Sequence, residues 1–289
     1  ESEEIFRSMS NAAQDAILMI NDDGAIVYWN NAAVKIYGYS SEEAIGKNLH
    51  RLLAPERYRA GQEKVFARFR ETGEGSLIGK ISEIKSLRKD GTEFPIELSL
   101  SAVKIKGRWN AIAIVRDITE RKRSEETLLQ LATTDALTGI FNRRYLNASL
   151  ETELKRAQRY RTPLALILFD IDQFKRINDI FGHPVGDLVL KHMADLVREK
   201  IREHDIFARW GGEEFVILVP NNGSDGARKL AEKLRGEIEK YHFPEVNTVT
   251  CGFGVTALQP DDKAENLLKR TDEALYKAKK MGRNRVEVS

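Results

Sequence analysis

A run of two glycines and two glutamates in the second half of the chain constrains its local structure more than any other feature. Gly211 and Gly212 are followed directly by Glu213 and Glu214. Hydrophobic residues flank this run on both sides: Ile206, Phe207, Val216, Ile217 and Leu218. Because glycine tolerates positive φ, the pattern predicts a strand, a tight turn and a second strand. A turn of glycines also leaves room for a ligand to approach its backbone.

Two adjacent carboxylates at a turn repel each other, by roughly 1 kcal/mol in water when they are about 4 Å apart. Solubility alone does not require this arrangement. A bound Mg²⁺ ion would favour it, because hard cations prefer carboxylate oxygens. Glu213 and Glu214 are therefore candidate metal ligands. An ordinary hairpin with a charged tip is the alternative, and the rest of the chain must decide between the two.

The composition indicates two globular domains. The chain has 289 residues, of which 42% are hydrophobic and 31% charged. A formal net charge of +2 gives no general attraction to nucleic acid or an anionic membrane, so we expect neither as a partner. The single cysteine, Cys251, excludes a disulfide within the chain and fits a cytoplasmic location. No apolar stretch is long enough to span a membrane, although a start at Glu1 leaves open a membrane segment upstream.

Residues 1–118 read as two strands, a group of short helices and three further strands. We expect a helix over 5–14, a hairpin of strands 16–20 and 25–29, and short helices that begin near Asn30 and Ser40. The three later strands are expected over 77–87, 93–103 and 109–116, with a hairpin turn at 89–92.

This order of segments resembles the PAS sensor family. Several short motifs carry the resemblance together: Asn30-Asn-Ala-Ala33, Gly38-Tyr-Ser40, Gly46-Lys-Asn-Leu49, Lys89-Asp-Gly91, Phe94-Pro95 and Asp117-Ile-Thr-Glu-Arg-Lys122. The resemblance implies an antiparallel sheet with helices on one side, which in many members encloses a small ligand. The sequence does not identify that ligand.

The same segment is similar to the haem-binding oxygen sensors of that family, with one important departure. Their iron ligand is a histidine shortly after a Pro-x-x-Tyr/Phe-Arg stretch. Here residues 55–59 form that stretch, but Gln62 stands about where the histidine would be, and glutamine is a poor ligand for haem iron. His50 lies upstream among leucines, where a structural role is the better interpretation. We therefore predict no haem.

Residues 119–134 form a connector that is rich in Glu, Lys and Arg and lacks Gly and Pro, which predicts a helix. Its apolar residues make only a narrow seam: Ile118, Leu128, Leu131 and Ala132. A solvated linker helix is one interpretation. We favour the other, a two-stranded coiled coil that joins two chains into a homodimer.

Residues 135–289 alternate helices and strands. We expect helices over 143–160, 186–202, 224–241 and 263–280. Strands are expected over 163–169, on both sides of the Gly-Gly-Glu-Glu turn, over 247–257 and over 286–288. The first strand is almost continuously apolar and ends in Asp170 and Asp172, a usual position for a metal ligand. The βαββαβ core predicts a ferredoxin-like sheet with helices on one face, so both domains are of the α+β class.

Six motifs of this segment occur in an informative order: Asp135-Ala-Leu-Thr-Gly139, Asn142-Arg-Arg144, Phe169-Asp-Ile-Asp-x-Phe-Lys175 with Ile177-Asn-Asp179, Gly182-His-x-x-Gly-Asp187, Gly211-Gly-Glu-Glu-Phe215 and Tyr276-Lys-Ala-Lys-x-x-Gly-Arg-Asn284. Together they resemble the GGDEF family of diguanylate cyclases, in a Gly-Gly-Glu-Glu-Phe form. The resemblance implies an enzyme that uses Mg²⁺ or Mn²⁺ to join two GTP molecules into cyclic di-GMP, with release of two pyrophosphates. Each subunit of a dimer would bring one GTP.

The resemblance also implies roles for the acidic residues. By motif position, Asp170, Glu213 and the backbone carbonyl of Ile171 bind the metal, and Glu214 is a second ligand or a base. GTP carries about four negative charges, so carboxylates alone would repel it and a metal ion must bridge them.

The remaining substrate contacts follow from motif position in the same way. Lys175, Lys279 and Arg283 should neutralise the phosphates, near Phe174 and the two turn glycines. Solvated cations at a helix C-terminus are the alternative for Lys279 and Arg283. Asn178 and Asp187 should read guanine, because a carboxylate accepts from N1 and N2 of guanine, which adenine cannot offer. A helix N-cap is the alternative for Asp187.

An Arg-x-x-Asp pair, Arg202 and Asp205, lies five residues before the turn at Gly211. In the GGDEF family this is an inhibitory site that binds the product, because arginine can donate two hydrogen bonds to guanine. A second arginine that often completes the site is replaced here by Lys233, which cannot make the paired contact.

A domain that binds GTP or cyclic di-GMP without catalysis is the competing hypothesis. Degenerate members of the family usually lose the metal carboxylates or the glycines. Asp170 and residues 211–214 are all present here, which favours the enzyme.

Overall fold

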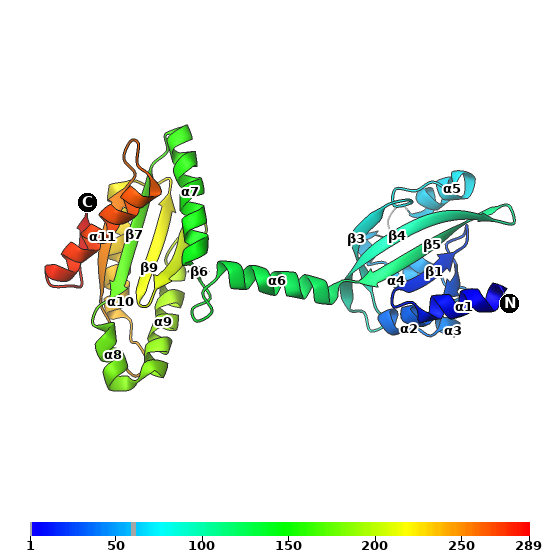
Figure 1. Cartoon of the computed structure of the whole chain (residues 1–289), viewed down its shortest axis with the longest axis horizontal. Helices are drawn as coiled ribbons and strands as arrows, with labels where there is room; N and C mark the ends of the chain where they lie inside the picture. The colour runs from blue at the N-terminus through cyan, green and yellow to red at the C-terminus, as the bar shows by residue number, and fades with distance from the viewer. Residues whose placement is uncertain (1, 59–61) are drawn as a thin grey trace. The chain divides into compact units, whose positions relative to one another are not determined.

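The structure is a computed structural model that describes residues 2–58 and 62–289. The chain forms two compact units, Glu1–Glu126 and Thr127–Ser289 (Figure 1). In the described ranges, no helix is long and apolar enough to cross a membrane.

The first unit is built on a five-stranded antiparallel sheet with the strand order β2-β1-β5-β4-β3. Its strands are β1 (Ala16–Ile20), β2 (Ile26–Trp29), β3 (Ile81–Leu87), β4 (Glu93–Ile105) and β5 (Arg108–Asp117). Its helices are α1 (Ser2–Ala12), α2 (Asn31–Tyr37), α3 (Ser41–Ala44), α4 (Leu49–Leu53), a 3-10 helix (Glu56–Tyr58) and α5 (Gln62–Thr72). This sheet with short helices is the PAS-like architecture that the sequence predicts.

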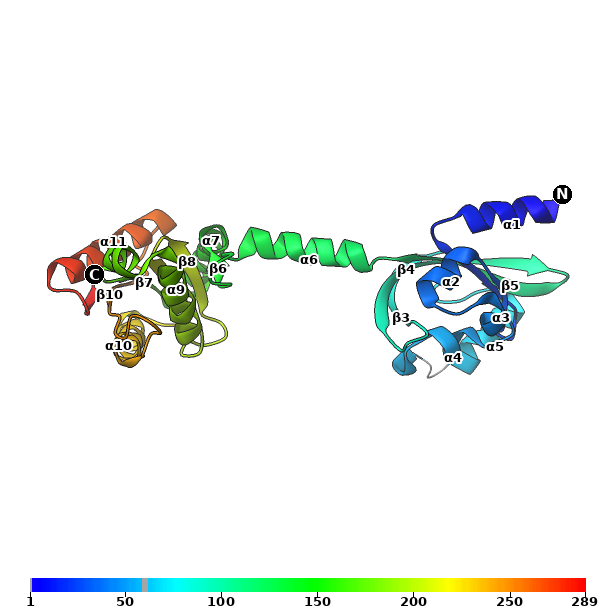
Figure 2. The same cartoon turned by 90° about the horizontal axis from the view of Figure 1, so that it is seen from below.

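Local hydrogen bonds explain why the short helices begin where they do. The Asn30 side chain accepts from the Ala33 amide, and Ser40 and Glu43 form the predicted capping box. Helices α2 to α5 each bury side chains against the same face of the sheet (Figure 2). The strand expected from residue 77 begins only at Ile81, because the Ile78 and Lys80 amides bond back to Gly75 and Leu77 in a turn.

The connector is helix α6 (Thr119–Thr133), as predicted, and the boundary between the two units falls within it. The Asp117 carboxylate starts the helix by accepting from the Thr119 amide and hydroxyl at 2.9 and 2.6 Å. Large apolar side chains of its second half are about two-thirds exposed: Leu128, Leu129 and Leu131.

The second unit contains a six-stranded sheet with the order β11-β10-β7-β9-β8-β6. Its strands are β6 (Phe141–Asn142), β7 (Leu164–Ile171), β8 (Ile206–Gly211), β9 (Glu214–Pro220), β10 (Cys251–Ala257) and β11 (Val286–Val288). Its helices are α7 (Arg143–Tyr160), α8 (Phe174–Phe181), α9 (His183–Arg198), α10 (Ser224–Lys240) and α11 (Ala264–Lys280). The four central strands are antiparallel in the ferredoxin-like order β10-β7-β9-β8.

Helices cover both faces of this sheet, which is more than the expected helices on one face of the βαββαβ core (Figures 1 and 2). Side chains of β7 alternate between two cores, and every residue of the strand is buried. Ile167 and Phe169 pack with α9 and α10, whereas Leu166 and Leu168 pack with α7 and α11. The βαββαβ core does place its helices on one face, and the flanking helices α7 and α11 cover the other.

Two predicted boundaries are wrong. The helix expected over 186–202 runs from His183 to Arg198, because Gly182 at φ +83 stops the preceding helix and Pro184 favours the first turn of the next. The strand expected from residue 247 begins only at Cys251. The short elements β6 and α8 were not predicted.

Candidate functional site

Pairing of strands β7 and β9 brings the acidic residues of the two motifs together. Asp170 lies opposite Glu214 in the antiparallel register. The Ile171 amide donates to the Glu213 carbonyl oxygen at 3.4 Å, so the backbone beside the carboxylates is also in contact. Gly212 adopts φ +53 in the turn between β8 and β9, a conformation that favours glycine. The predicted hairpin is therefore confirmed. Glu213 and Glu214 at its turn lie beside Asp170 and Ile171 of β7.

The electrostatics of this group are those of a crowded set of anions. Asp170 is 6% exposed, and its Oδ2 pairs with the Lys279 ammonium at 2.9 Å. Burial raises the pKa of Asp170 to about 6; Lys279 opposes the rise, and Glu213 and Glu214 add to it. Burial also raises the pKa of Glu214. A cation among these carboxylates would relieve their mutual repulsion.

The donors fit a hard divalent cation. They are all oxygens: the carboxylates of Asp170, Glu213 and Glu214, and the carbonyl of Ile171. Within the part of the chain that the structure describes, no group of three or more His, Cys, Asp or Glu residues is arranged to hold a metal ion by itself. Mg²⁺ typically takes one or two carboxylates and completes its shell with water and substrate phosphates, so these oxygen donors would suit it.

Asp172, the second acidic residue at the end of β7, makes hydrogen bonds that hold a neighbouring segment in place. Its Oδ2 accepts from the Thr250 hydroxyl at 2.8 Å and from the Asn284 amide at 3.0 Å. The second bond holds a segment in which Arg283 and Asn284 both have positive φ, at +62 and +42. Asp172 therefore fixes the backbone that carries Arg283, and Arg283 lines a hollow beside α8 together with Arg176.

The packing of helices α8 and α9 places the expected guanine-reading residue Asn178 against Gly186, the residue before Asp187. A Cβ atom added to Gly186 would lie 2.0 Å from Asn178 Oδ1 and 3.2 Å from Phe174 Cζ, so only glycine allows this approach. Asp187 follows directly and is exposed. The N-cap alternative for Asp187 is wrong, because Gly182 precedes the helix and Asp187 lies inside its second turn. Lys175 is exposed near the start of α8.

The Arg-x-x-Asp pair forms a tight turn at a separate hollow. The Arg202 amide donates to Asp205 Oδ2 at 3.0 Å, and the Asp205 amide donates to the Arg202 carbonyl at 3.1 Å. Both residues line a hollow of about 430 Å³ together with Lys229 and Lys233. The structure therefore places Lys233 beside Arg202, where the sequence comparison with the family put the missing arginine.

Arg209 was overlooked in the sequence. Its Nε donates to the Gly212 carbonyl at 2.9 Å, and its Nη1 donates to Asp135 Oδ1 at 3.1 Å. Asp135 belongs to the motif that follows the connector, so the two contacts join distant motifs. The only signal in the sequence was the position of Arg209 two residues before Gly211. Its contact with Asp135 joins residues far apart in sequence, so no local pattern predicts it.

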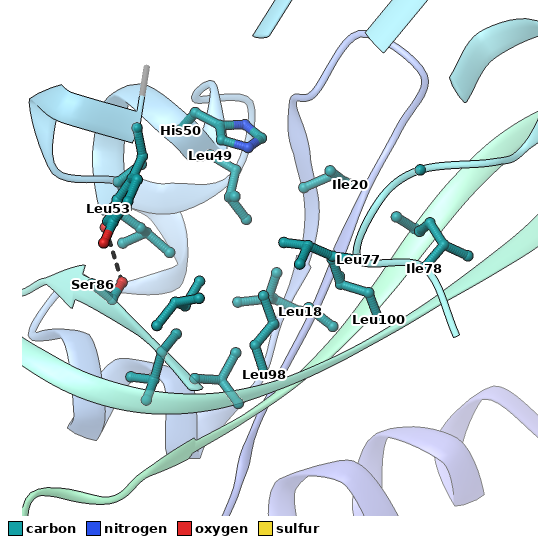
Figure 3. Close-up of a pocket in the computed structure, with 18 of the residues that line it drawn as sticks. Leu18, Ile20, Leu49, His50, Leu53, Leu77, Ile78, Ser86, Leu98 and Leu100 are labelled. Atoms are coloured by element: carbon teal, nitrogen blue, oxygen red, sulfur yellow. Dashed lines mark hydrogen bonds between the residues drawn. The ribbon is translucent and has the colours of Figure 1, made fainter. Parts of the chain in front are cut away.

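The first unit encloses a cavity of about 360 Å³ beneath its sheet (Figure 3). The lining is mainly aliphatic, and it includes Leu18, Leu98 and Leu100. Burial raises the pKa of Tyr37 to about 12 and lowers the pKa of His50, so both lining groups are uncharged at neutral pH. Residues 59–61 and the side chain of Gln62 lie outside the described residues, so the departure from the haem-binding pattern stays a prediction.

Comparisons with known proteins agree with this architecture. Residues 132–285 match the family described as diguanylate cyclase, GGDEF domain, and residues 14–120 match the PAS domain. Diguanylate cyclase DgcM of Escherichia coli K12 is 34% identical over 280 residues, which are 96% of this chain and 66% of that protein. DgcP of Pseudomonas aeruginosa is 46% identical over 216 residues, 74% of this chain and 32% of that protein. The chain thus spans less than two thirds of both relatives.

One curated relative is matched over most of its length. A diguanylate cyclase of Vibrio cholerae is 34% identical over 275 residues, 93% of this chain and 84% of that protein. Among solved structures, the coiled coil and GGDEF domain of DgcB from Caulobacter crescentus, in complex with c-di-GMP, has a TM-score of 0.56 at 30% identity. That alignment covers 59% of this chain and 93% of the other. The chain therefore belongs to the family of diguanylate cyclase GGDEF-domain proteins, with a PAS domain ahead of its GGDEF domain.

Proposed function

We propose that this protein is a diguanylate cyclase that condenses two GTP molecules into cyclic di-GMP and releases two pyrophosphates. The observation that carries the proposal is the placement of Asp170 opposite Glu214, with Glu213 beside it and Lys279 in contact with Asp170. Opposed carboxylates next to a lysine suit a substrate whose phosphates need both a metal ion and direct cationic contacts.

Asp170, Glu213 and the Ile171 carbonyl would hold Mg²⁺ or Mn²⁺, with Glu214 beside them. The bound ion would supply charge neutralisation between these carboxylates and the phosphates. Lys175, Lys279 and Arg283 add positive charge at the β- and γ-phosphates, near Phe174 and the turn formed by Gly211 and Gly212. Asn178 and Asp187 receive the guanine base.

In the reaction, the 3′-hydroxyl of one GTP attacks the α-phosphorus of the other. The O3′–Pα bond forms, the bond from Pα to the bridging oxygen breaks, and pyrophosphate leaves. Glu214 accepts the hydroxyl proton, a role that suits a carboxylate whose pKa is raised by burial. The 3′-hydroxyl of the second GTP then attacks the α-phosphorus of the first in the same way, which closes the ring and releases the second pyrophosphate. Since each domain carries one set of these residues, two chains must meet, and we propose a homodimer that forms through α6.

Two forms of control accompany this function. Cyclic di-GMP binds the hollow of Arg202 and Asp205 and inhibits the enzyme from there. The cavity of the PAS unit binds a small and largely apolar ligand, because its lining is mainly aliphatic and Lys85, a charged member of the lining, is an exposed residue. Mass spectrometry of molecules released from purified protein tests the second point. Recovery of haem or another charged cofactor would contradict it.

Glu213→Gln tests the catalytic proposal, because it removes one charged oxygen ligand while it keeps the side-chain volume. We expect formation of cyclic di-GMP and pyrophosphate from GTP to fall at least a hundredfold at equal Mg²⁺. Glu151→Gln, on the exposed side of α7, is the matched control and should keep the parental rate. Turnover of Glu213→Gln within tenfold of the parent would contradict the assignment of Glu213 as a metal ligand. GTP binding by the parent without pyrophosphate release would instead support the silent receptor.

A further inference from the structure

A single guanidinium group joins the Gly-Gly-Glu-Glu turn to the segment that follows the connector. Arg209 donates from Nε to the Gly212 carbonyl at 2.9 Å and from Nη1 to Asp135 Oδ1 at 3.1 Å. The side chains of Arg209 and Asp135 are only 15% and 24% exposed, so the pair is largely shielded from water. Shielding strengthens such a charged hydrogen bond relative to one at the surface.

The Asp135 end of this link is itself firmly held. Its Oδ1 also accepts from the Thr138 amide at 2.9 Å and the Thr138 hydroxyl at 2.8 Å, and its own amide donates to Ile140 at 2.8 Å. Asn142 then donates its side-chain amide to the Ala132 and Thr134 carbonyls at 3.0 and 3.2 Å. A continuous set of hydrogen bonds therefore runs from the last turn of α6 to the Asp135 turn.

The Gly212 end of the link lies directly before the acidic residues. The register of β8 and β9 shifts between Arg209 and Gly211, and Gly211 pairs with Glu214 beyond the shift, so Gly212 and Glu213 lie outside the paired residues of these two strands. Glycines at 211 and 212 supply no side chain to anchor the turn either. The Arg209 contact with the Gly212 carbonyl therefore adds a side-chain anchor to the turn directly before Glu213, whose own carbonyl accepts from the Ile171 amide.

We infer that Arg209 is a positioning residue that fixes the Gly212 turn to the end of helix α6, and so sets the placement of Glu213 and Glu214. The inference deepens the proposed function and rests on it, because Arg209 acts through the turn and does not touch substrate. An arginine is required at this position, since its rigid fork reaches two acceptors at once. A lysine ammonium cannot reproduce that planar paired geometry.

The first test compares Arg209→Lys and Arg209→Ala with Arg156→Lys, a control on the exposed surface of α7. We expect both Arg209 variants to lose at least tenfold in turnover with a GTP KM within threefold of the parent, because small displacements of catalytic groups reduce the chemical step. Although Arg209→Lys keeps the positive charge, we do not expect it to restore the turnover of the parent. Asp135→Asn should act in the same direction, and its effect should not add to that of Arg209→Ala. Parental turnover in both Arg209 variants would overturn the inference.

The second test does not depend on catalysis. Backbone amide exchange at residues 211–214 should be at least tenfold faster in Arg209→Lys than in the parent, while exchange in the β7 core stays the same. Unchanged exchange in the turn would overturn the inference, even if activity fell. If the parent makes no cyclic di-GMP but exchange rises as expected, the proposed function fails and the anchoring by Arg209 stands.

Discussion

At the residue scale, the site combines closely spaced carboxylates with a small number of cationic side chains, of which Lys279 contacts Asp170 directly. Lys279 pairs with Asp170, and in the proposed cyclase it would exchange this internal partner for a substrate phosphate. Asp172 and Asn284 hold the neighbouring Arg283 backbone in a left-handed conformation that costs about 1 kcal/mol or more. The structure thus places Arg283 by fixing its backbone.

Asp170 makes the stability of the metal-free protein depend on pH. Its pKa is 3.8 as a free side chain and about 6 in the folded protein. Between these values the folded protein binds more protons than the unfolded chain, so the contribution of Asp170 to stability is full below about pH 4 and is lost as pH rises through 6. We expect Asp170→Asn to flatten this dependence in urea unfolding with EDTA across that range. Parallel curves for parent and variant would contradict the expectation.

Asp187 should set the choice of base. Asp187→Ser removes the carboxylate that would accept from guanine N1 and N2, while Gly186 and its approach to Asn178 are kept. We expect the preference for GTP over ATP to fall at least tenfold in competition assays with mixed nucleotides. Asp195→Ser, on the exposed surface of the same helix, is the control. An unchanged product ratio would count against the role of Asp187.

At the element scale, sequence predicts most reliably where local signals are complete. Helix α7 matches its predicted bounds, because Asn142 provides an N-cap and no Gly or Pro interrupts the helix. Helix α9 does not, because it begins at His183 after Gly182, ahead of the Gly186-Asp187 pair that was taken as its start. The layer order of the sheet was missed for another reason. Burial of β7 on both faces was visible in the sequence, but which helices cover each face depends on tertiary packing.

The candidate site follows the same rule. Asp170, Glu213 and Asp187 stand in local motifs, so their positions could be predicted. The contacts of Arg209 with Asp135 and of Asp172 with Asn284 join residues far apart in sequence, and no local pattern shows them. Arg209, which was overlooked, and Asp172, whose structural contacts were not predicted, both bond to residues of another motif.

The hollow between Lys233 and the Arg202 turn allows a prediction about product inhibition. Arg202→Ala should weaken inhibition by added cyclic di-GMP at least tenfold. The fold should survive, because the contacts of Arg202 with Asp205 use its backbone. Lys233→Arg should strengthen inhibition several-fold, since a guanidinium can make a paired contact with guanine. Lys269→Arg on α11 is the control, and overlapping dose-response curves for all four proteins would remove the inhibitory role.

At the scale of the whole molecule, helix α6 is the covalent route between the PAS unit and the GGDEF unit. It begins in hydrogen bonds with Asp117 of the PAS sheet and ends in hydrogen bonds with Asn142 at the start of α7. Between these ends, Leu128, Leu129 and Leu131 are exposed, as a helix that pairs with a second copy would require. A ligand in the PAS cavity can change activity only if it binds two arrangements of this helix with different affinity.

The rotational phase of α6 should therefore control activity. Two residues inserted after Glu126 would turn the downstream part of the helix by about 200°, whereas seven would return it to within about 20° of its original phase. We expect the two-residue insertion to change basal formation of cyclic di-GMP at least tenfold and the seven-residue insertion to change it much less. Sedimentation should show whether each variant still dimerises, so that loss of pairing is separated from loss of phase. If both variants keep the parental activity and dimerisation, α6 is a passive tether, and the sensor must act on the catalytic unit by another route.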